Sequence, residues 1–478
     1  MTDPITFSEL QVSNRKPGTY IELNTRNAVR GLPGNPQHLL IIAQRLAAGT
    51  VAEAIPTQVY SSDEAATYAG RGSAAHLMVK ASIAANRYVD LTLCLLDDAA
   101  AGAAAVKTVT LTGPATGPGE LRLFIGNQRI AVAVANEATA VVVAALLNTE
   151  IAKYTDLLYT AAVGEGASTH IITATCRHKG TVGNQVDITY ECTAPGITVA
   201  IATATPGATD PDIQDALDAV LGETYELITT HINDATSAGA LRDHLDTVSH
   251  GMEMRAGRGV LGYDGLLADA VTLADGINGG RVGLCYLRAT RSPAYEIAAG
   301  CASAEAAPAF EDPAVPRRDV YIKGLHAPAI ADRLSDSEMH TLLYSGVAPL
   351  VVGPGEKVQI KRFISTYTVN AEAVADPALL DFNTLAILDY GRKAIRQSLS
   401  NKFSNQKATA RTLANVRSDI YATALRLEEA EIWENVEANK DGIVVIVDPN
   451  EPTRFRFRCP ADVVNGLMQI FGVIDMIL

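Results

Sequence analysis

A glycine pattern is the first place at which this sequence could bind a cofactor. The residues from Gly257 to Gly262 read Gly-Arg-Gly-Val-Leu-Gly, which satisfies the Gly-x-Gly-x-x-Gly pattern of dinucleotide sites. Such a site needs a buried strand before the first glycine and an acidic residue about 20 positions further on. Only Met-Glu-Met-Arg, at residues 252–255, stands before this pattern. We therefore predict a loop of an α/β domain here, and we keep as the alternative function an α/β enzyme that binds a nucleotide between Gly257 and Gly262.

The other reactive side chains form weaker patterns. His170, Cys176 and His178 could share one face of a strand, but three ligands do not make the closed set of four of a structural zinc site. Residues 246–250 contain Asp, Ser and His, yet they lack the nucleophile-elbow pattern, and an adjacent Ser-His pair has poor geometry for catalysis. Residues 353–357 lack the spacing of a phosphate loop and are predicted to be a turn. We predict no catalytic residues, no cofactor and no metal.

Three arginines alternate with two phenylalanines near the C-terminus. On a strand, Arg454, Arg456 and Arg458 would lie on one face, and the rings of Phe455 and Phe457 on the other. An ordinary half-buried strand has the same alternation. The functional interpretation is a basic strip that faces an acidic surface on a neighbouring molecule while the phenylalanine face packs inward.

Composition limits the classes of partner. The chain has 478 residues, a length that is enough for two to four domains with sizeable cores. Of these residues, 48% are apolar but only 5% are aromatic. Its net charge of −14 argues against nucleic acid, and no segment approaches the roughly 18–20 apolar residues of a membrane span. The start contains Asp3 and Glu9 and does not read as a signal peptide, so we expect synthesis in the cytoplasm. The six cysteines lie far apart and are expected to be buried thiols.

The elements that would position these residues begin with a β-α-α-β pattern. A strand at 37–45 precedes a helix that starts at the capping box of residues 61–64, a second helix at 73–86 and a strand at 88–96. The same helix and strand periods resume at Asp210-Pro211 and continue to about residue 345. We predict one α/β domain, formed by residues 31–98 and 209–345.

Residues 99–208 differ from their flanks. They carry few charges and many Ala, Thr, Val and Gly, and six short strands are expected there around one helix at about 137–153. We predict a β-rich insertion domain whose two ends lie close together. A glycan-binding surface protein with this domain as its binding module is a further alternative, but such modules usually display aromatic side chains. The insertion has few of them, chiefly Phe124, Tyr154, Tyr159 and Tyr190.

The last third of the chain contains helices and a hairpin. Val358 begins a strand, Asp376-Pro377 opens a helix, and residues 414–439 are strongly amphipathic. Residues 442–447 and 453–458 flank Asp-Pro-Asn-Glu-Pro and predict a β-hairpin. We assign residues 346–462 to a C-terminal domain that carries this hairpin, 1–30 to an N-terminal arm and 463–478 to a C-terminal arm. The fold class is α/β, or α+β when all domains are taken together.

Both ends of the chain read as apolar strands without a partner of their own. Residues 16–23 form a turn followed by alternating apolar and polar residues, and 471–478 run apolar to the last residue. A two-stranded hairpin is marginally stable alone and needs further strands. Because an unpaired apolar strand is a liability in a monomer and useful in a polymer, we predict a subunit that joins its neighbours by exchanging strands.

Several stretches, in this order along the chain, resemble the tail sheath protein of contractile-tailed bacteriophages, of the Mu-like type. They are the Pro-Gly-Thr-Tyr-Ile-Glu opening at 17–22, the Gly-Asn-Gln-Arg-Ile-Ala-Val stretch at 126–132 with its Ala-rich helix, residues 173–184, and the end from Gly442 through 460–465 to the apolar tail. The resemblance implies a structural protein and no enzyme. Its subunits form hexameric rings, stacked helically around a tail tube, that rotate and widen when the sheath contracts. The implied partners are copies of the chain itself, the tail tube protein, the baseplate and the tail terminator, and the implied location is the phage tail, assembled in the cytoplasm of the host.

The resemblance also implies roles for individual residues. In the family, the arms of neighbouring subunits complete a shared sheet with the C-terminal hairpin. The donated strands would contain Tyr20, Ile21, Glu22, Leu23, Val473, Ile474 and Ile477, and the receiving hairpin would contain Ile443, Val445 and Val447. The arginine face formed by Arg454, Arg456 and Arg458 is the candidate contact with the tube.

Overall fold

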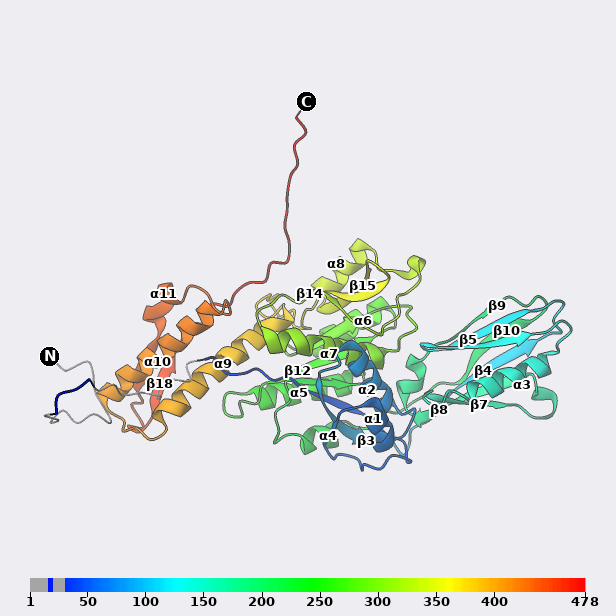
Figure 1. Ribbon diagram of the computed structural model, residues 1–478, viewed down its shortest axis with the longest axis horizontal. Helices are drawn as coiled ribbons and strands as arrows, with labels where there is room; N and C mark the ends of the chain where they lie inside the picture. Colours follow the sequence, from blue (N-terminus) through cyan, green and yellow to red (C-terminus); the bar gives the residue numbers. More distant parts are fainter. Residues whose placement is uncertain (1–15, 20–30, 478) are drawn as a thin grey trace. The chain divides into compact units, whose positions relative to one another are not determined.

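The computed structural model describes residues 16–19 and 31–477 and divides into two compact units (Figure 1). Unit 1 comprises the described residues up to Gly34, Lys393–Ala430 and Val436–Pro460. Unit 2 comprises Asn35–Arg392, Glu431–Asn435 and the described residues from Ala461 onward. The mixed α/β class predicted from the sequence is confirmed.

The core of unit 2 is a nine-stranded sheet with the order β14-β16-β15-β13-β12-β11-β1-β3-β2. Its six central strands, from β15 to β3, run parallel, and strands covered on both faces are expected to be apolar throughout. Strand β1 fits this rule from Leu39 to Ala43, which are apolar and buried, and its last residue, Gln44, is buried but polar. The strands are β1 His38–Gln44, β2 Thr57–Val59, β3 Asp90–Leu96, β11 Leu227–Thr230, β12 Arg258–Tyr263, β13 Val282–Tyr286, β14 Arg318–Tyr321, β15 Val347–Gly353 and β16 Lys357–Arg362.

Helices cover both faces of this sheet. Successive side chains of a strand point to opposite faces, and β1 shows the result: Leu39 and Ile41 join one hydrophobic core, and Leu40 and Ile42 join the other. The first core includes residues of α1, α2 and α7, and the second includes residues of α4, α5, α6 and α8. These helices are α1 Ser62–Ala69, α2 Ala74–Ala85, α4 Gln214–Ala219, α5 Ala235–Ser249, α6 Leu267–Ile277, α7 Ala294–Glu311 and α8 Asp336–Tyr344.

The segment between β3 and β11, which the sequence assigns to an insertion, contains strands β4 to β10 and helix α3, and Figure 1 labels all of these except β6. One sheet has the order β10-β4-β8-β7 and the other the order β6-β5-β9. The sequence prediction missed β7 only. The elements are β4 Ala104–Thr112, β5 Gly119–Ile125, β6 Gln128–Val134, α3 Ala140–Ile151, β7 Tyr159–Val163, β8 Ile171–Lys179, β9 Ile188–Cys192 and β10 Thr198–Thr205.

The last third differs from the prediction in two helices. Helix α9, Phe382–Phe403, begins five residues after Pro377, because Leu380 and the residues around it hydrogen-bond to Phe363 and Ser365 instead of forming a helical turn. The expected single helix at 414–439 is divided into α10, Ala410–Glu429, and α11, Val436–Asn439. Between them, Glu431–Asn435 belong to unit 2, and Trp433 is buried. Strands β15 and β16 also extend the large sheet past residue 345, where the sequence predicted that the α/β domain would end.

Candidate assembly surfaces

All of the glycine pattern except Gly257 lies in strand β12, in the middle of the large sheet, so the prediction of a loop was wrong. Its glycines allow close packing. A Cβ atom on Gly262 would lie 2.1 Å from the carbonyl oxygen of Ala294 in α7, and one on Gly257 would lie 2.6 Å from that of Tyr225. A phosphate cannot approach a backbone that is covered by its own chain in this way, so the alternative of a nucleotide site between Gly257 and Gly262 is also overturned.

The usual ligand crevice of an α/β sheet lies at the carboxyl ends of the strands where the strand order reverses, here between β1 and β11. Buried side chains fill this position. The Gln44 amide donates to Asp98 Oδ1 (2.9 Å) and to the Lys179 carbonyl (3.0 Å), and its oxygen accepts from His231 Nε2 (2.9 Å). His178 Nδ1 donates to the same Asp98 oxygen (2.9 Å). Burial lowers the pKa of His231 to about 3, so this imidazole is neutral. The crevice is therefore closed by Asp98, His178 and Lys179, which belong to the insertion or directly precede it.

His178 is therefore engaged in this network, and residues 16–19 and 31–477 contain no cluster of three or more His, Cys, Asp or Glu side chains that could hold a metal. All six cysteines are free thiols, and four of them are buried as the sequence predicted, whereas Cys192 and Cys459 are partly exposed. Within the same residues, no helix is both long and apolar enough to cross a bilayer.

The predicted C-terminal hairpin is present in unit 1. Strand β17, Val444–Val447, pairs antiparallel with β18, Phe455–Arg458, with Val445 opposite Phe457. Ile443 and Val445 are buried, and the Arg417 side chain of α10 donates to the Ile443 carbonyl (2.8 Å). One face of the hairpin is thereby held on α10.

The rest of the hairpin is open. Within the described part of the chain, β17 and β18 pair only with each other, so each strand keeps one edge without a ladder partner. Four apolar side chains on the hairpin are about half exposed, namely Val444, Ile446, Val447 and Phe457. The expectation that the phenylalanine face packs inward is therefore met only in part. Two open edges and apolar side chains are what a further strand would need in order to bind here.

The arginine strip is partly engaged within the hairpin itself. Asp448 is buried at the turn, and its Oδ2 atom lies 2.8 Å from Arg456 Nε and 3.3 Å from Arg454 Nε. The backbone N–H of Asn450 donates to the same carboxylate (2.9 Å), and this bond and the guanidinium of Arg456 lower the pKa of Asp448. Arg458 has no carboxylate within ion-pair distance among the described residues. It is the member of the strip that is freest to contact another molecule.

The C-terminal segment is held at its beginning and open at its end. The Glu434 and Val464 backbone N–H groups donate to the carbonyls of Asp462 (2.9 Å) and Ile432 (3.3 Å), and Arg318 donates to the carbonyl of Met468 (2.7 Å). From residue 469 to 477 the chain makes no hydrogen bond to any described residue and forms no strand. The candidate strand residues Val473, Ile474 and Ile477 are 87%, 99% and 93% exposed. The other candidate strand, with Tyr20, Ile21, Glu22 and Leu23, lies outside the described residues.

The last third of the chain contains a further charged segment, to which the sequence prediction gave no role. No acidic residue stands between Asp389 and Asp419, although the chain as a whole has a net charge of −14. This basic segment covers the second half of α9, the connection to α10 and the first turns of α10, and Lys402 is ion-paired with Asp419. Its Lys and Arg residues are Arg392, Lys393, Arg396, Lys402, Lys407, Arg411 and Arg417.

In a comparison with known protein families, residues 206–366 match the central domain of phage tail sheath proteins. The tail sheath protein of the Mu-like prophage FluMu of Haemophilus influenzae is 30% identical to this chain over 495 residues, which cover 99% of this chain and 100% of that protein.

Solved structures agree in fold. A sheath tail protein of Desulfitobacterium hafniense has a TM-score of 0.52 at 13% identity, with 94% of this chain and 97% of that chain covered. One of Listeria innocua has a TM-score of 0.52 at 14% identity, with 93% and 95% covered. The contracted helical sheath of the anti-feeding prophage has a TM-score of 0.52 at 11% identity, with 97% and 99% covered.

Proposed function

This chain belongs to the phage tail sheath protein family, and we propose that it polymerises by strand exchange into the contractile sheath of a phage tail. Its role is structural and not enzymatic. The observation that carries the mode of assembly is a pair of complementary features: a hairpin with two open edges, and the segment 469–477, whose apolar side chains are exposed. The hairpin edges of one subunit would bind the segment 469–477 of a neighbouring subunit, and the apolar side chains of that segment would then be buried.

In this proposal, residues 1–30 and 463–478 are arms, and the hairpin β17–β18 of a neighbour receives them. A donated strand of about five residues makes ladder bonds of roughly 1 kcal/mol each, which nearly offset the roughly 1–2 kcal/mol per residue that ordering the strand costs. Burial of Val473, Ile474 and Ile477 adds roughly 1.5–3 kcal/mol for each side chain. One arm therefore binds weakly, and several arms per subunit make a stable polymer.

The proposal extends to partners and location. Copies of the chain form hexameric rings that stack helically around the tail tube, with the baseplate at one end and the tail terminator at the other. Assembly takes place in the cytoplasm of the host bacterium, and contraction drives the tube through the host envelope. The sheath role of the family supports this arrangement, and the acidic net charge of −14 suits a protein that must remain soluble at high copy number.

We place the tube contact on the basic surfaces of unit 1. These are the arginine strip of Arg454, Arg456 and Arg458, and the part of the basic segment that runs from Lys393 to Arg417. Arg458 and the exposed residues Lys407 and Arg411 have no carboxylate partner among the described residues. An acidic surface on the tube would complement them.

Removal of the C-terminal arm tests strand exchange. A variant that ends at Met468 should keep the fold, because residues 469–477 make no hydrogen bonds to the described chain. Its thermal midpoint as a monomer should equal that of the full chain, whereas negative-stain microscopy should show no tubes. A second variant without residues 1–24 should behave in the same way.

The matched control is Asp475→Asn in the full chain, which leaves the apolar side chains of the arm in place. It should form tubes like those of the parent. Tubes of ordinary length from either truncated variant would contradict strand exchange.

A further inference from the structure

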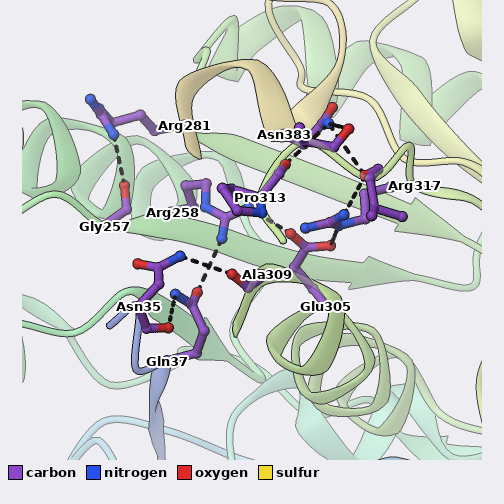
Figure 2. A network of polar contacts seen from close by, with 12 residues as sticks. Asn35, Gln37, Gly257, Arg258, Arg281, Glu305, Ala309, Pro313, Arg317 and Asn383 are labelled. Carbon is purple, nitrogen blue, oxygen red and sulfur yellow. Dashed lines mark hydrogen bonds and ion pairs between the residues drawn. The ribbon is translucent and has the colours of Figure 1, made fainter. Parts of the chain in front are cut away.

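Two chain segments that lead from unit 2 into unit 1 start at one buried polar network, shown in Figure 2. The first is the start of β1, with Asn35 and Gln37, where unit 2 begins. The second is the start of α9, with Phe382 and Asn383, ten residues before the unit boundary at Arg392. The residues that connect these two segments are Arg258 of β12, Glu305 of α7 and Arg317, which precedes β14.

The centre of the network is Glu305 of α7, whose side chain is 1% exposed. Its Oε1 accepts from Arg258 Nη1 of β12 (2.7 Å), and its Oε2 accepts from Arg317 Nε (2.7 Å). Both guanidinium groups are buried as well, at 5% and 1% exposure. One carboxylate is therefore held in a fixed orientation by two cations, which Figure 2 shows on either side of it.

Bonds lead from this centre to the start of β1. Arg258 Nη2 donates to the side-chain oxygen of Gln37 (3.3 Å), and the Asn35 amide donates to the carbonyl of Ala309, one turn after Glu305 in α7. The second bond is 2.8 Å long. The first residues of unit 2 are thus fixed to both the network and its helix.

Other contacts lead to the start of α9. The guanidinium of Arg258 lies over the Phe382 ring, 5.1 Å from its centroid, and Phe382 stacks on Phe363 at 4.2 Å. The Asn383 amide donates to the carbonyls of residues 313–315 at 3.4–3.5 Å, and Arg317 donates to the last of these carbonyls. The network of these three charged residues therefore contacts both the start of β1 and the start of α9.

The energetics of a buried ion network point to a role other than stability. Removing charges from water costs several kcal/mol per ion, so well-packed apolar side chains of similar volume are often equally or more stabilising. Two arginines against one glutamate leave a surplus cation, which makes this cluster a poor source of stability. What the network does provide is fixed geometry, because each guanidinium has only one set of directions for its hydrogen bonds.

We infer that Arg258, Glu305 and Arg317 are positioning residues. They set the direction in which the chain before β1 and the chain of α9 lead away from the sheet. This inference rests on the proposed function, because those two segments lead to the N-terminal arm and to the unit that carries the hairpin. A lattice in which every subunit binds its neighbours through such segments requires the same exit directions in each copy. The network gives the fold one arrangement where an apolar cluster would tolerate several.

The test replaces the charges by apolar side chains of similar size, in the variant Arg258→Met, Glu305→Leu, Arg317→Met. The monomer should unfold at the midpoint of the parent or above it, by circular dichroism. Negative-stain microscopy should show at least a tenfold loss of tubes, or tubes of irregular diameter. The surface pair Arg333→Gln, Glu356→Gln is the matched control, and it should assemble as the parent does.

A second variant keeps the ion network and removes its links to the start of β1, by Asn35→Ala with Gln37→Ala. It decides the question if the triple variant does not fold, and it should be folded and form irregular tubes. Normal tubes from a folded triple variant, or from the Asn35 and Gln37 variant, overturn the inference. The variant that ends at Met468 is measured beside them: if it also forms tubes, strand exchange has failed, and if it does not, only the positioning role has failed.

Discussion

At the scale of single residues, two glutamates lie in surroundings that shift their pKa values in opposite directions. Loss of water around Glu296 in the first turn of α7 raises its pKa to about 7, although Lys80 and a hydrogen bond from the Asn127 amide favour the charged form. The guanidinium of Arg288 lowers the pKa of Glu338 to about 2, with help from the backbone N–H of Ser335. Their effects on stability should therefore have opposite pH dependence.

We predict that Glu296→Gln stabilises the protein at pH 8 and has little effect at pH 4.5. Between pH 4.5 and 7 the folded chain retains a proton that the unfolded chain has lost, so the stability of the parent falls as the pH rises through this window. Glutamine removes the charge and keeps an oxygen that can accept from Asn127. The gain at pH 8 should approach roughly 3 kcal/mol, from about 1.4 kcal/mol for each pKa unit. Urea unfolding followed by the fluorescence of Trp433, the single tryptophan, measures it.

Glu338→Gln serves as the control with the opposite sign. A carboxylate with a lowered pKa stabilises the fold above about pH 4.5, and this contribution disappears as the pH falls toward 2. The substitution should therefore destabilise at pH 8 and become neutral in acid. A Glu296→Gln variant with the same shift in its urea midpoint at pH 4.5 and pH 8 would contradict the assignment of the charge effect.

At the scale of elements, the contact between β12 and α7 depends on a missing side chain. We predict that Gly262→Ala destabilises the protein by roughly 1–3 kcal/mol, the usual cost of overpacking, because the added methyl would lie 2.1 Å from the Ala294 carbonyl oxygen and 2.7 Å from the Ala298 nitrogen. Gly239 in α5 has no atom within 4 Å of such a methyl, so Gly239→Ala should stabilise by roughly 0.5–1 kcal/mol through helix propensity. Thermal unfolding compares the two. Equal effects of the two substitutions would show that the sheet can move away from α7 without penalty.

The same strand shows how far local sequence determines the fold. Elements with a local signal, such as α5 and the strands of the insertion other than β7, were predicted from period and capping alone. Strand β12 was not predicted, because Gly259 and Gly262 weaken its strand signal. The need for glycine at these positions comes from the close packing of α5 and α7 against them, which the local sequence does not show. The late start of α9 has a similar cause, because backbone bonds to Phe363 and Ser365 compete with the local preference of Asp-Pro for a helix start.

The candidate assembly surfaces divide in the same way. The hairpin could be predicted, because Val445 lies in a short apolar run and Phe457 in an alternating one, on either side of a Pro-rich turn. The ion pairs of Arg454 and Arg456 with Asp448 could not be predicted, because the alternation of a strand shows which side chains share a face but not which residues they contact. The network of Glu305 with Arg258 and Arg317 was beyond reach as well, since Arg258 lies 47 positions from Glu305 in the chain and only the fold brings them together.

At the scale of the whole molecule, charge is distributed unevenly. The chain carries a net charge of −14, yet residues 390–418 contain only basic charges. A copy of this chain would therefore be repelled by acidic surfaces in general and attracted to them through unit 1. Such a distribution directs a subunit to bind an acidic partner in one orientation.

We predict that Lys407→Glu with Arg411→Glu, and separately Arg458→Glu, weaken co-assembly with the tube and leave the fold intact. All three side chains lack a carboxylate partner among the residues described, whereas reversal of Arg454 or Arg456 would also disturb the buried Asp448. Each reversed charge should cost roughly 1 kcal/mol or less for each subunit at low salt. The loss should shrink above about 0.15 M salt, where the Debye length falls below about 8 Å. Co-sedimentation with purified tube protein over a salt series measures both effects. Arg87→Glu, at an exposed position in unit 2, makes the same change in net charge as Arg458→Glu and should leave binding unchanged. Variants that co-sediment like the parent at every salt concentration would remove unit 1 from the tube contact while leaving strand exchange untouched.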